Sequence, residues 1–512
     1  MEVIMKKLTR SLSLALICAL LLPACAQDGS EQTAETTAAV ADTTAIVETT
    51  ADPNDRSQVK DNVPEGLTFN GESVRVLYRG EESDTNNICI YDVRGTDNIG
   101  DYVTDGVWNR NRTVEERLNI TLECMPLGAG TLSEHAAKVK SIILAGSDEY
   151  DYLNVTGNTS ITSGLNNYMR DLANIPYVDY DADWWWMDAI EALSLDGKTY
   201  NYIFGDSLIY CYIQTGVVYY NKTLYENAFG DPDEMYKIVM DGQWTIDKLM
   251  ELTAASYSDA NGDGVPNAGD IFGSMKTANQ GEETPHFLQG FDLNLYTRDE
   301  EDNLIIDFDQ ERCVTAIEKL GQYNVNTEGV FHSDQGIDGG TGAYFVQNYS
   351  VFYPARLSRV LSADFRDMEN PYGILPYPKL NEDQKDYVSL IHDSCSNICV
   401  PKTVPDAKFE VVGAALEALA AESWRSVMPM FLETALKLKY SQDSMSGQVI
   451  DMVVASVSKN TLFEYKNYCA DIFTTALVNN AKAGTNNFSS AYKKLGPAAQ
   501  KQWDKAVDNL EK

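Results

Sequence analysis

The sequence predicts an α/β fold built as two lobes, and two observations lead to this class. A chain of 512 residues is longer than a single hydrophobic core usually organises, so more than one lobe is expected. Strands and helices alternate over the first part of the folded region, which is typical of a largely parallel sheet covered by helices. Apolar residues make up 44% of the chain and aromatic residues 10%, enough to fill two such cores.

The composition is strongly acidic, with a net charge of −36 at pH 7. Nucleic-acid binding requires clustered Lys and Arg side chains, and the sequence contains no such basic patch. We therefore expect no nucleic-acid partner, and we expect a highly soluble, monomeric protein.

The N-terminus is typical of a secretion signal. Several basic residues precede an apolar run over 12–22, which is too short to span a bilayer as a stable helix. The following sequence LPAC, at 22–25, resembles a bacterial lipobox, which implies removal of a signal peptide 1–24 and lipidation of Cys25, for example with palmitate. Pro23 is uncommon at that position, so ordinary cleavage is the alternative. A cysteine with several acyl chains would hold the protein at the extracellular face of the cell membrane.

The segment 25–66 predicts a disordered tether that begins at the lipidated cysteine. It is rich in Thr, Ala, Asp and Glu, has few large apolar side chains and shows no hydrophobic period. Such a segment cannot bury enough apolar surface to offset the entropy lost on ordering. The folded body is therefore expected to begin near Leu67.

Hydrophobic periodicity predicts the elements of this body in chain order. The first lobe should contain a strand at 73–78, a helix at 107–118, a strand at 120–124, a helix at 131–145 capped by Gly146, and a strand at 150–155. Later segments should form a helix at 309–323, an apolar strand-like run at 344–353, an extended run at 389–400, and a helix at 406–423 with Asp406 as candidate N-cap. From 428 onward the pattern is mostly helical.

Nine motifs, taken in order, carry a family resemblance that covers about residues 67–512. They are the lipobox at Cys25, AGSDEYDYLNV (145–155), DWWWMDAI (183–190), LDGKTYNYIFGD (195–206), GVVYYNKTLYE (216–226), DGQWTIDKLMELT (241–253), SDANGDGVPNAGDIFG (258–273), YGILPYPKLNEDQ (372–384) and LEALAAES (416–423). Each motif is weak alone, but the ordered set resembles the family 1 extracellular solute-binding proteins, the lipoprotein receptors of carbohydrate ABC importers in Gram-positive bacteria.

The resemblance implies a type II periplasmic-binding-protein-like fold, with crossing hinge segments and a central ligand cleft. The implied N-lobe is 67–210 plus 393–445, and the implied C-lobe is 211–392 plus 446–512. The crossings are expected near 209–217 and 391–400. The implied function is capture of a carbohydrate, an oligosaccharide, by lobe closure and its delivery to the permease subunits of an ABC importer. A crevice between lobes is also where ligand sites generally occur.

The candidate ligand residues lie on segments expected to edge the cleft. They are Trp185, Trp186, Tyr212, Gln214, Tyr344, Asn348 and Arg356. Pyranose rings can stack on aromatic faces, and Trp and Tyr combine apolar area with a polar group. The alternative for the tryptophans is core packing, because successive residues of a helix point in different directions and only one or two can face a cleft.

An acidic, Gly-rich loop begins like an EF-hand calcium loop. Oxygen ligands at positions 1, 3, 5, 7, 9 and 12 would come from Asp259, Asn261, Asp263, the Val265 carbonyl, Asn267 and Asp270. Position 12 is Asp where EF-hands carry a bidentate Glu. Two interpretations stay open, a structural Ca²⁺ site and an Asx-turn loop without metal.

The sequence offers no catalytic signature. HExxH, GxSxG, P-loop and dinucleotide-binding glycine motifs are all absent, so we predict a non-enzyme without a catalytic cofactor. Cys395 and Cys399 would lie roughly 13 Å apart on a strand, too far for a disulfide or one tetrahedral ion, so buried thiols are expected. Two functional alternatives remain: an extracellular glycan-degrading enzyme, whose carboxylate pair would be spatial and not sequential, and a receptor for peptides or other small solutes on the same fold.

Overall fold

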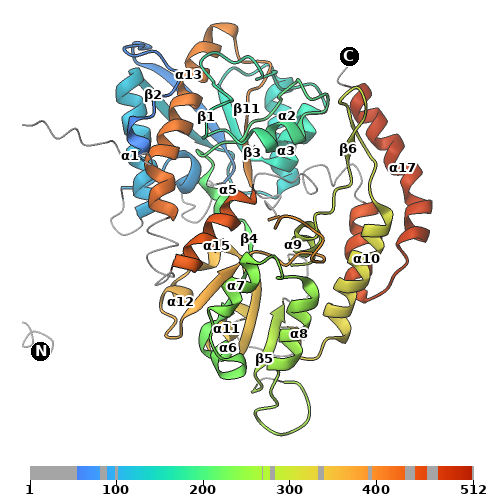
Figure 1. Cartoon of the computed structure of the whole chain (residues 1–512). Coiled ribbons are helices and arrows are strands. Elements are labelled where there is room, and N and C mark those ends of the chain that lie inside the picture. Colours follow the sequence, from blue (N-terminus) through green and yellow to red (C-terminus); the bar gives the residue numbers. More distant parts are fainter. Residues whose placement is uncertain are drawn as a thin grey trace, which may run out of the picture. The chain divides into compact units, whose positions relative to one another are not determined.

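A computed structural model describes residues 55–80, 89–97, 102–267, 269–276, 283–332, 340–389, 395–432, 444–457 and 471–509. The chain divides into two units, 1–53 and 54–512, and all described residues belong to the second. This second unit, the body, is a mixed α/β structure with two main sheets (Figure 1), so the predicted class is confirmed. Cys25 and the signal peptide lie outside the described residues.

The first sheet has four strands in the order β11-β3-β1-β2. The parallel strands are β1 (Glu72–Tyr78), β2 (Ile120–Pro126) and β3 (Tyr152–Thr156), and β11 (Ser396–Cys399) pairs antiparallel with β3. Its helices are α1 (Tyr102–Leu118), α2 (Leu132–Leu144), α3 (Gly157–Gly164) and α13 (Asp406–Glu422). The predicted alternation of strands and helices is therefore confirmed in this part of the chain.

The ends of two helices beside the first sheet test the capping predictions. Thr131 and Glu134 form a capping box at the start of α2, and Gly146 follows its end with φ of 67°, as the C-terminal prediction required. The N-cap prediction for Asp406 is wrong. Pro405 occupies the N-cap position with extended backbone, and Asp406 is the first residue of α13. There its carboxylate still lies beside the positive end of the helix dipole.

The second sheet has five strands in the order β10-β4-β9-β5-β8. They are β4 (Gly216–Asn221), β5 (Phe272–Lys276), β8 (Val330–His332), β9 (Ser350–Arg356) and β10 (Tyr372–Leu375). β5 runs parallel to β8 and β9, whereas β4 is antiparallel to both β9 and β10. The carboxyl ends of β5, β8 and β9 therefore lie at one edge of the sheet.

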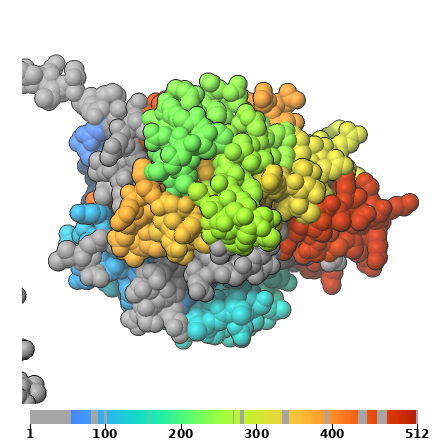
Figure 2. Space-filling view, turned by 90° about the horizontal axis from the view of Figure 1, so that it is seen from below, coloured from blue at the N-terminus to red at the C-terminus, as the bar shows by residue number. Residues whose placement is uncertain are grey.

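The remaining helices lie against this sheet or elsewhere in the body. They are α4 (Met187–Leu193), α6 (Lys222–Phe229), α7 (Glu234–Met240), α8 (Ile246–Ser256), α9 (Glu283–Gly290), α10 (Gln310–Gly321), α11 (Gly340–Val346), α12 (Ala363–Arg366), α15 (Ser444–Ala455), α16 (Asn479–Ala483) and α17 (Phe488–Asp508). A small hairpin pairs β6 (Thr297–Arg298) with β7 (Leu304–Ile305). Figure 2 shows α17 (red) beside α10 (yellow) at one side of the body, and the two helices are in contact.

The strand-like run predicted at 344–353 is wrong in its first part. Tyr344 belongs to α11, the chain turns at Asn348 with a φ of 66°, and the strand begins only at Ser350. A short buried helix and a buried strand have the same apolar character, so periodicity cannot separate them.

One short helix, α5 (Ile209–Ile213), lies between the two sheets in Figure 1. It leads directly into β4 of the second sheet, whereas β11, far along the chain, belongs to the first sheet. The crossings expected near 209–217 and 391–400 fall at these two places, although 390–394 lie outside the described residues. The predicted lobe limits stay a prediction, because the body forms one compact unit.

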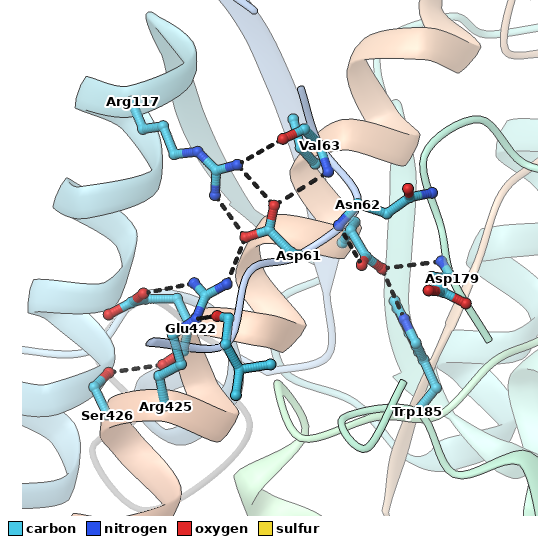
Figure 3. A network of polar contacts seen from close by, with 11 residues as sticks. Asp61, Asn62, Val63, Arg117, Asp179, Trp185, Glu422, Arg425 and Ser426 are labelled. Atoms are coloured by element: carbon cyan, nitrogen blue, oxygen red, sulfur yellow. Dashed lines mark hydrogen bonds and ion pairs between the residues drawn. The ribbon is translucent and has the colours of Figure 1, made fainter. Parts of the chain in front are cut away.

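The segment before β1 is part of the folded body (Figure 3). Asp61 accepts hydrogen bonds from Arg117 at 2.6 and 2.7 Å and from Arg425 at 2.8 Å, which ties it to α1 and to the turn after α13. Burial raises the pKa of Asp61, but the hydrogen bonds from both arginines outweigh it and lower that pKa overall. The tether predicted for 25–66 therefore ends earlier, and residues 55–66 belong to the body. Within the part of the chain that the structure describes, no helix combines the length and apolarity needed to cross a membrane.

Candidate functional site

Two cavities among the described residues contain predicted ligand residues. The first, which we call the strand-end pocket, has a volume of about 240 Å³. It is lined by Glu283, His286, Tyr353, Pro354, Ala355, Arg356, Ser358, Arg359 and Tyr377. The second, which we call the aromatic pocket, has a volume of about 540 Å³ and includes Trp185, Trp186, Asp206, Tyr212 and Trp424.

The strand-end pocket lies at the carboxyl end of β9, beside the start of α9. Ligands in open α/β sheets bind outside the carboxyl ends of the strands. Arg356, the last residue of β9, donates a hydrogen bond from Nη1 to Oε1 of Gln214 at 2.6 Å. Arg356 also pairs with Gly216 across β4 and β9. A polar side chain from the crossing is thus joined to the sheet at the place where a ligand is expected.

His286 packs directly on the backbone of Gly216. A Cβ atom at Gly216 would lie 2.3 Å from Nδ1 of His286, so only glycine fits this position. The imidazole ring stacks on Tyr377, with ring centroids 5.3 Å apart. Burial raises the pKa of Tyr377 well above its usual value, so its hydroxyl stays protonated. The floor of the pocket is therefore closely packed, and its Tyr377 hydroxyl is neutral.

Tyr210, on α5, is influenced by charges from both parts of the body. Burial raises the pKa of its phenol to about 12, and the positive charges of Arg79 and Arg356 act in the opposite direction. Arg79 follows β1 of the first sheet, and Arg356 ends β9 of the second. A cationic side chain from each sheet therefore acts on the phenol of Tyr210.

A buried polar network holds α5 in place. Asp92 accepts a hydrogen bond from the backbone N of Tyr210 at 2.7 Å through Oδ1, and one from Ser396 through Oδ2. Arg110 donates to the Asp92 carbonyl at 2.7 Å and to Ser423 Oγ at 3.1 Å. Burial raises the pKa of Asp92 to about 7. This network connects α1, α5 and β11, so it positions the crossing against the first sheet.

The aromatic pocket includes Tyr212 of α5 among its lining residues. Asp206 accepts two hydrogen bonds through Oδ1, from Trp186 Nε1 and from the Tyr212 hydroxyl, both at 2.8 Å. Burial raises the pKa of Asp206 to about 6. The Trp186 and Tyr212 rings meet edge to face, with centroids 4.8 Å apart. Trp185 donates from Nε1 to Glu417 of α13 at 2.8 Å, as Figure 3 shows.

No protein-family model and no curated protein matches the chain. Solved structures do match it over most of their length. The sugar-binding protein MalE from Xanthomonas citri is 14% identical with a TM-score of 0.54, covering 86% of this chain and 99% of that one. An ABC substrate-binding protein from Listeria monocytogenes in complex with cycloalternan is 12% identical with a TM-score of 0.52, covering 85% and 99%. The fold is that of the two-lobed solute-binding proteins.

A third similar structure comes from the family that the sequence motifs resemble. A family 1 extracellular solute-binding protein from Bifidobacterium longum subsp. infantis is 12% identical with a TM-score of 0.50, covering 85% of this chain and 100% of that one. At these identities the likeness concerns the fold.

The structure distributes the predicted ligand residues over three places. Trp185, Trp186 and Tyr212 line the aromatic pocket. Gln214 and Arg356 meet at the strand-end pocket. Tyr344 and Asn348 precede β9, whereas Arg356 ends it, so they lie about 20 Å from Arg356 along that strand. Their side chains are engaged elsewhere: the Tyr344 hydroxyl accepts from Gly269 N at 2.9 Å, and Asn348 Oδ1 accepts from Asn221 Nδ2 at 2.6 Å. The ligand role of all seven stays a prediction.

The tryptophan cluster differs from its expected local structure. The three residues precede α4, and Trp185 forms a bridge with Gly205, so they do not follow successive helical positions. All three side chains are nevertheless 6% exposed or less. Core packing thus accounts for most of their surface, and only Trp185 and Trp186 line a cavity.

Sequence reasoning missed several residues in or near the two pockets. Tyr210 stands four positions before Gln214, so helical spacing places both on one face of α5, and this signal was available. His286 and Glu283 had no such signal, because α9 reaches the pocket only through the packing of the second sheet. Asp206 was also missed, although it ends the motif LDGKTYNYIFGD.

The acidic loop folds on itself through its own polar groups. Asp259 accepts from Gly262 N at 2.7 Å and from Gly264 N at 2.8 Å. Asp270 is fully buried, and its Oδ2 accepts from Asn267 N at 3.1 Å, whereas its Oδ1 lacks a partner among the described residues. Within those same residues, no group of three or more His, Cys, Asp and Glu is arranged to hold a metal. The calcium site stays a prediction.

Cys395 and Cys399 are buried and form no disulfide within the described residues, as predicted. Burial raises the pKa of the Cys399 thiol, so it stays protonated.

Proposed function

We propose that this chain is a lipid-anchored extracellular receptor that binds a carbohydrate between its two lobes and delivers it to an ABC importer. The observation that supports this most is the hydrogen bond from Arg356, at the strand-end pocket, to Gln214 beside α5, with Arg79 and Arg356 both acting on the phenol of Tyr210. These groups donate and accept hydrogen bonds, as the hydroxyls of a sugar require. The similar structures are described as sugar-binding and substrate-binding proteins, and one contains cycloalternan.

The binding step would be lobe closure. A ligand that touches Arg79 after β1 and Arg356 at the end of β9 contacts both sheets at once. Because only a difference in affinity between two states can shift their equilibrium, such a ligand favours the conformation in which both groups reach it. The short α5 helix would absorb the change in backbone angles.

Calorimetry against a panel of oligosaccharides, paired with a product assay, tests this proposal. We expect one saturable site for a glycan and no change in that glycan after prolonged incubation. Conversion of the glycan into smaller products would instead support the degrading enzyme. Binding of peptides without binding of any glycan would support the receptor for other solutes.

A matched pair of variants locates the site. Arg356→Ala should weaken glycan binding, whereas Arg366→Ala, at an exposed position of α12, should leave it unchanged. Equal affinity in both variants would remove the strand-end pocket from the proposal.

The anchor and the state of assembly are tested on the secreted protein. Mass spectrometry of the mature N-terminus should find acyl chains on Cys25, and a Cys25→Ala variant should be released from membranes. Light scattering should give the mass of a monomer.

We also propose that the loop from Asp259 to Asp270 holds a structural Ca²⁺ ion. Its oxygen-bearing side chains recur at the positions that an EF-hand loop uses, and Gly264 adopts the left-handed backbone, with φ of 75°, that position 6 requires. The buried Oδ1 of Asp270 would gain a partner.

A further inference from the structure

The aromatic pocket is assembled from parts of the chain that are far apart in sequence. Its walls come from the N-terminal segment, the loop before α4, α5 with its preceding loop, the chain after α13, and the end of α15. The aromatic side chains among them are Tyr180, Trp185, Trp186, Tyr212 and Trp424. With a volume of about 540 Å³, the cavity lies within the usual size range of small-molecule sites.

The charged side chains that line this pocket are mostly acidic. They are Asp181, Asp183, Asp188 and Asp206, with Arg56 as the one base. Charges of one sign around a cavity with apolar walls concentrate ligands of the opposite sign. The lining therefore favours a cation over a neutral molecule and disfavours an anion.

Asp206 points to a ligand independently of the other acids. Asp206 is buried, with 5% of the residue exposed. Oδ1 accepts from Trp186 and Tyr212, whereas Oδ2 has no hydrogen-bond partner within the described part of the chain. Because Asp206 lines the cavity, a positive group there could bind this oxygen, which still has its accepting capacity.

The aromatic pocket already contains one contact between a cation and an aromatic ring. The guanidinium carbon of Arg56 lies 4.6 Å from the ring centroid of Trp424, and Arg56 Nη1 donates to the Trp424 carbonyl at 3.1 Å. Aromatic rings attract cations through the negative charge on their faces. Arg56 thus shows that this wall accepts a positive group.

We propose that the aromatic pocket is a second binding site, separate from the strand-end pocket, for a small organic ammonium ion that lies between the aromatic wall and Asp206. A metal ion fits less well, because no group of three or more potential ligands is arranged for one in the described ranges. A neutral sugar would gain nothing from the excess of carboxylates. The site does not depend on the identity of the ligand in the strand-end pocket.

Calorimetric titration of the purified protein with choline tests the proposal, and the neutral isostere 3,3-dimethylbutan-1-ol is the matched probe. The two molecules have nearly the same shape, so charge is the only large difference. We expect choline to bind at least tenfold more tightly. Equal affinity for both probes would overturn the proposal, and so would no binding of choline at millimolar concentration.

Two variants change the charge of the pocket in opposite directions. Asp206→Asn should weaken choline binding about tenfold, whereas Asp241→Asn, at an exposed position after α7, should not change it. Arg56→Gln removes the competing cation and should tighten choline binding severalfold. The Arg56 variant changes a half-buried surface residue, so it keeps the test valid even if Asp206→Asn fails to fold. Unchanged affinity in Arg56→Gln would contradict the predicted role of charge.

The pH dependence provides a further readout. The titratable and polar groups around Asp206 are Trp186, Tyr212, Arg56 and Asp183. Choline binding should weaken as pH falls through about 6, where Asp206 becomes protonated. A glycan that binds the wild type but not Asp206→Asn, and that choline displaces, would show instead that this pocket is the sugar site and would overturn the inference.

Discussion

The two cavities differ in both chemistry and position. The strand-end pocket contains Arg356 and His286 at the carboxyl edge of the second sheet, and Arg356 is hydrogen-bonded to Gln214 beside α5. The aromatic pocket is lined by Trp185, Trp186 and Asp206 with other residues from loops and helix ends. Composition alone favours the aromatic pocket as a sugar site, whereas topology favours the strand-end pocket. The comparison teaches that side-chain chemistry and position relative to the strand ends select different cavities, so ligand affinity has to decide between them.

The largest expected effect is a loss of glycan affinity, and it should differ between variants of the two cavities. Arg356→Ala should weaken glycan binding roughly 100-fold, or about 3 kcal/mol, because it removes a charged donor and leaves Gln214 without its partner. Tyr212→Phe, in the aromatic pocket, should change glycan affinity less than about threefold. Calorimetry on both variants measures the difference. The reverse order would make the aromatic pocket the carbohydrate site.

The close contact between Gly216 and His286 at the strand-end pocket gives the next prediction. Gly216→Ala should lower the free energy of unfolding by about 2 kcal/mol, because the new methyl group overlaps His286. Gly447→Ala in α15 is the control, since a Cβ there meets no atom within 4 Å and alanine favours a helix. Chemical denaturation compares the two. Equal stability in both variants would mean that His286 does not pack on Gly216 as described.

Two buried carboxylates, Asp92 and Asp206, predict that the stability of the protein depends on pH. Burial raises the pKa of Asp92 to about 7 from an ordinary value of 3.8, so the folded protein binds the proton more tightly than the unfolded chain does. The stability that this group contributes is complete below pH 3.8 and is lost as pH rises through about 7. Asp92→Asn should remove a slope of up to about 1.4 kcal/mol per pH unit between those values.

Denaturation curves of Asp92→Asn and wild type, recorded from pH 4 to 8, measure this difference. The same comparison for Asp206→Asn should show a similar slope over a shorter range that ends near pH 6, and so a smaller total change, because burial raises the pKa of Asp206 only to about 6. Parallel stability profiles for wild type and Asp92→Asn would rule out a raised pKa at Asp92.

The smallest effect concerns the acidic loop, which lies in neither cavity. Millimolar Ca²⁺ should raise the melting temperature by a few degrees, since a ligand that binds only the folded state stabilises it. Asp270→Asn should abolish that shift while leaving the affinities for glycan and choline unchanged. A melting temperature that does not respond to Ca²⁺ after chelation would leave the Asx-turn loop as the better interpretation.

Part of the candidate site could be predicted from local patterns. Gln214 and Arg356 were identified because each lies on a segment expected near the crossing, and they form a hydrogen bond. Tyr344 and Asn348 were placed with them because their run resembled a single strand. The turn at Asn348 instead puts them at the far end of β9. A one-dimensional pattern contains no information on which end of a strand faces a cleft.

The sequence by itself determined the α/β class, the net acidic charge and the limits of several helices, among them α2 and α13. These follow from local periodicity, capping residues and composition, which act over a few neighbours along the chain. Only the tertiary structure decided that the predicted ligand residues divide between separate cavities, that His286 packs on Gly216 and that Asp206 is buried. Those contacts join residues distant in sequence, and their geometry depends on how the sheets pack, which no short stretch of the chain specifies.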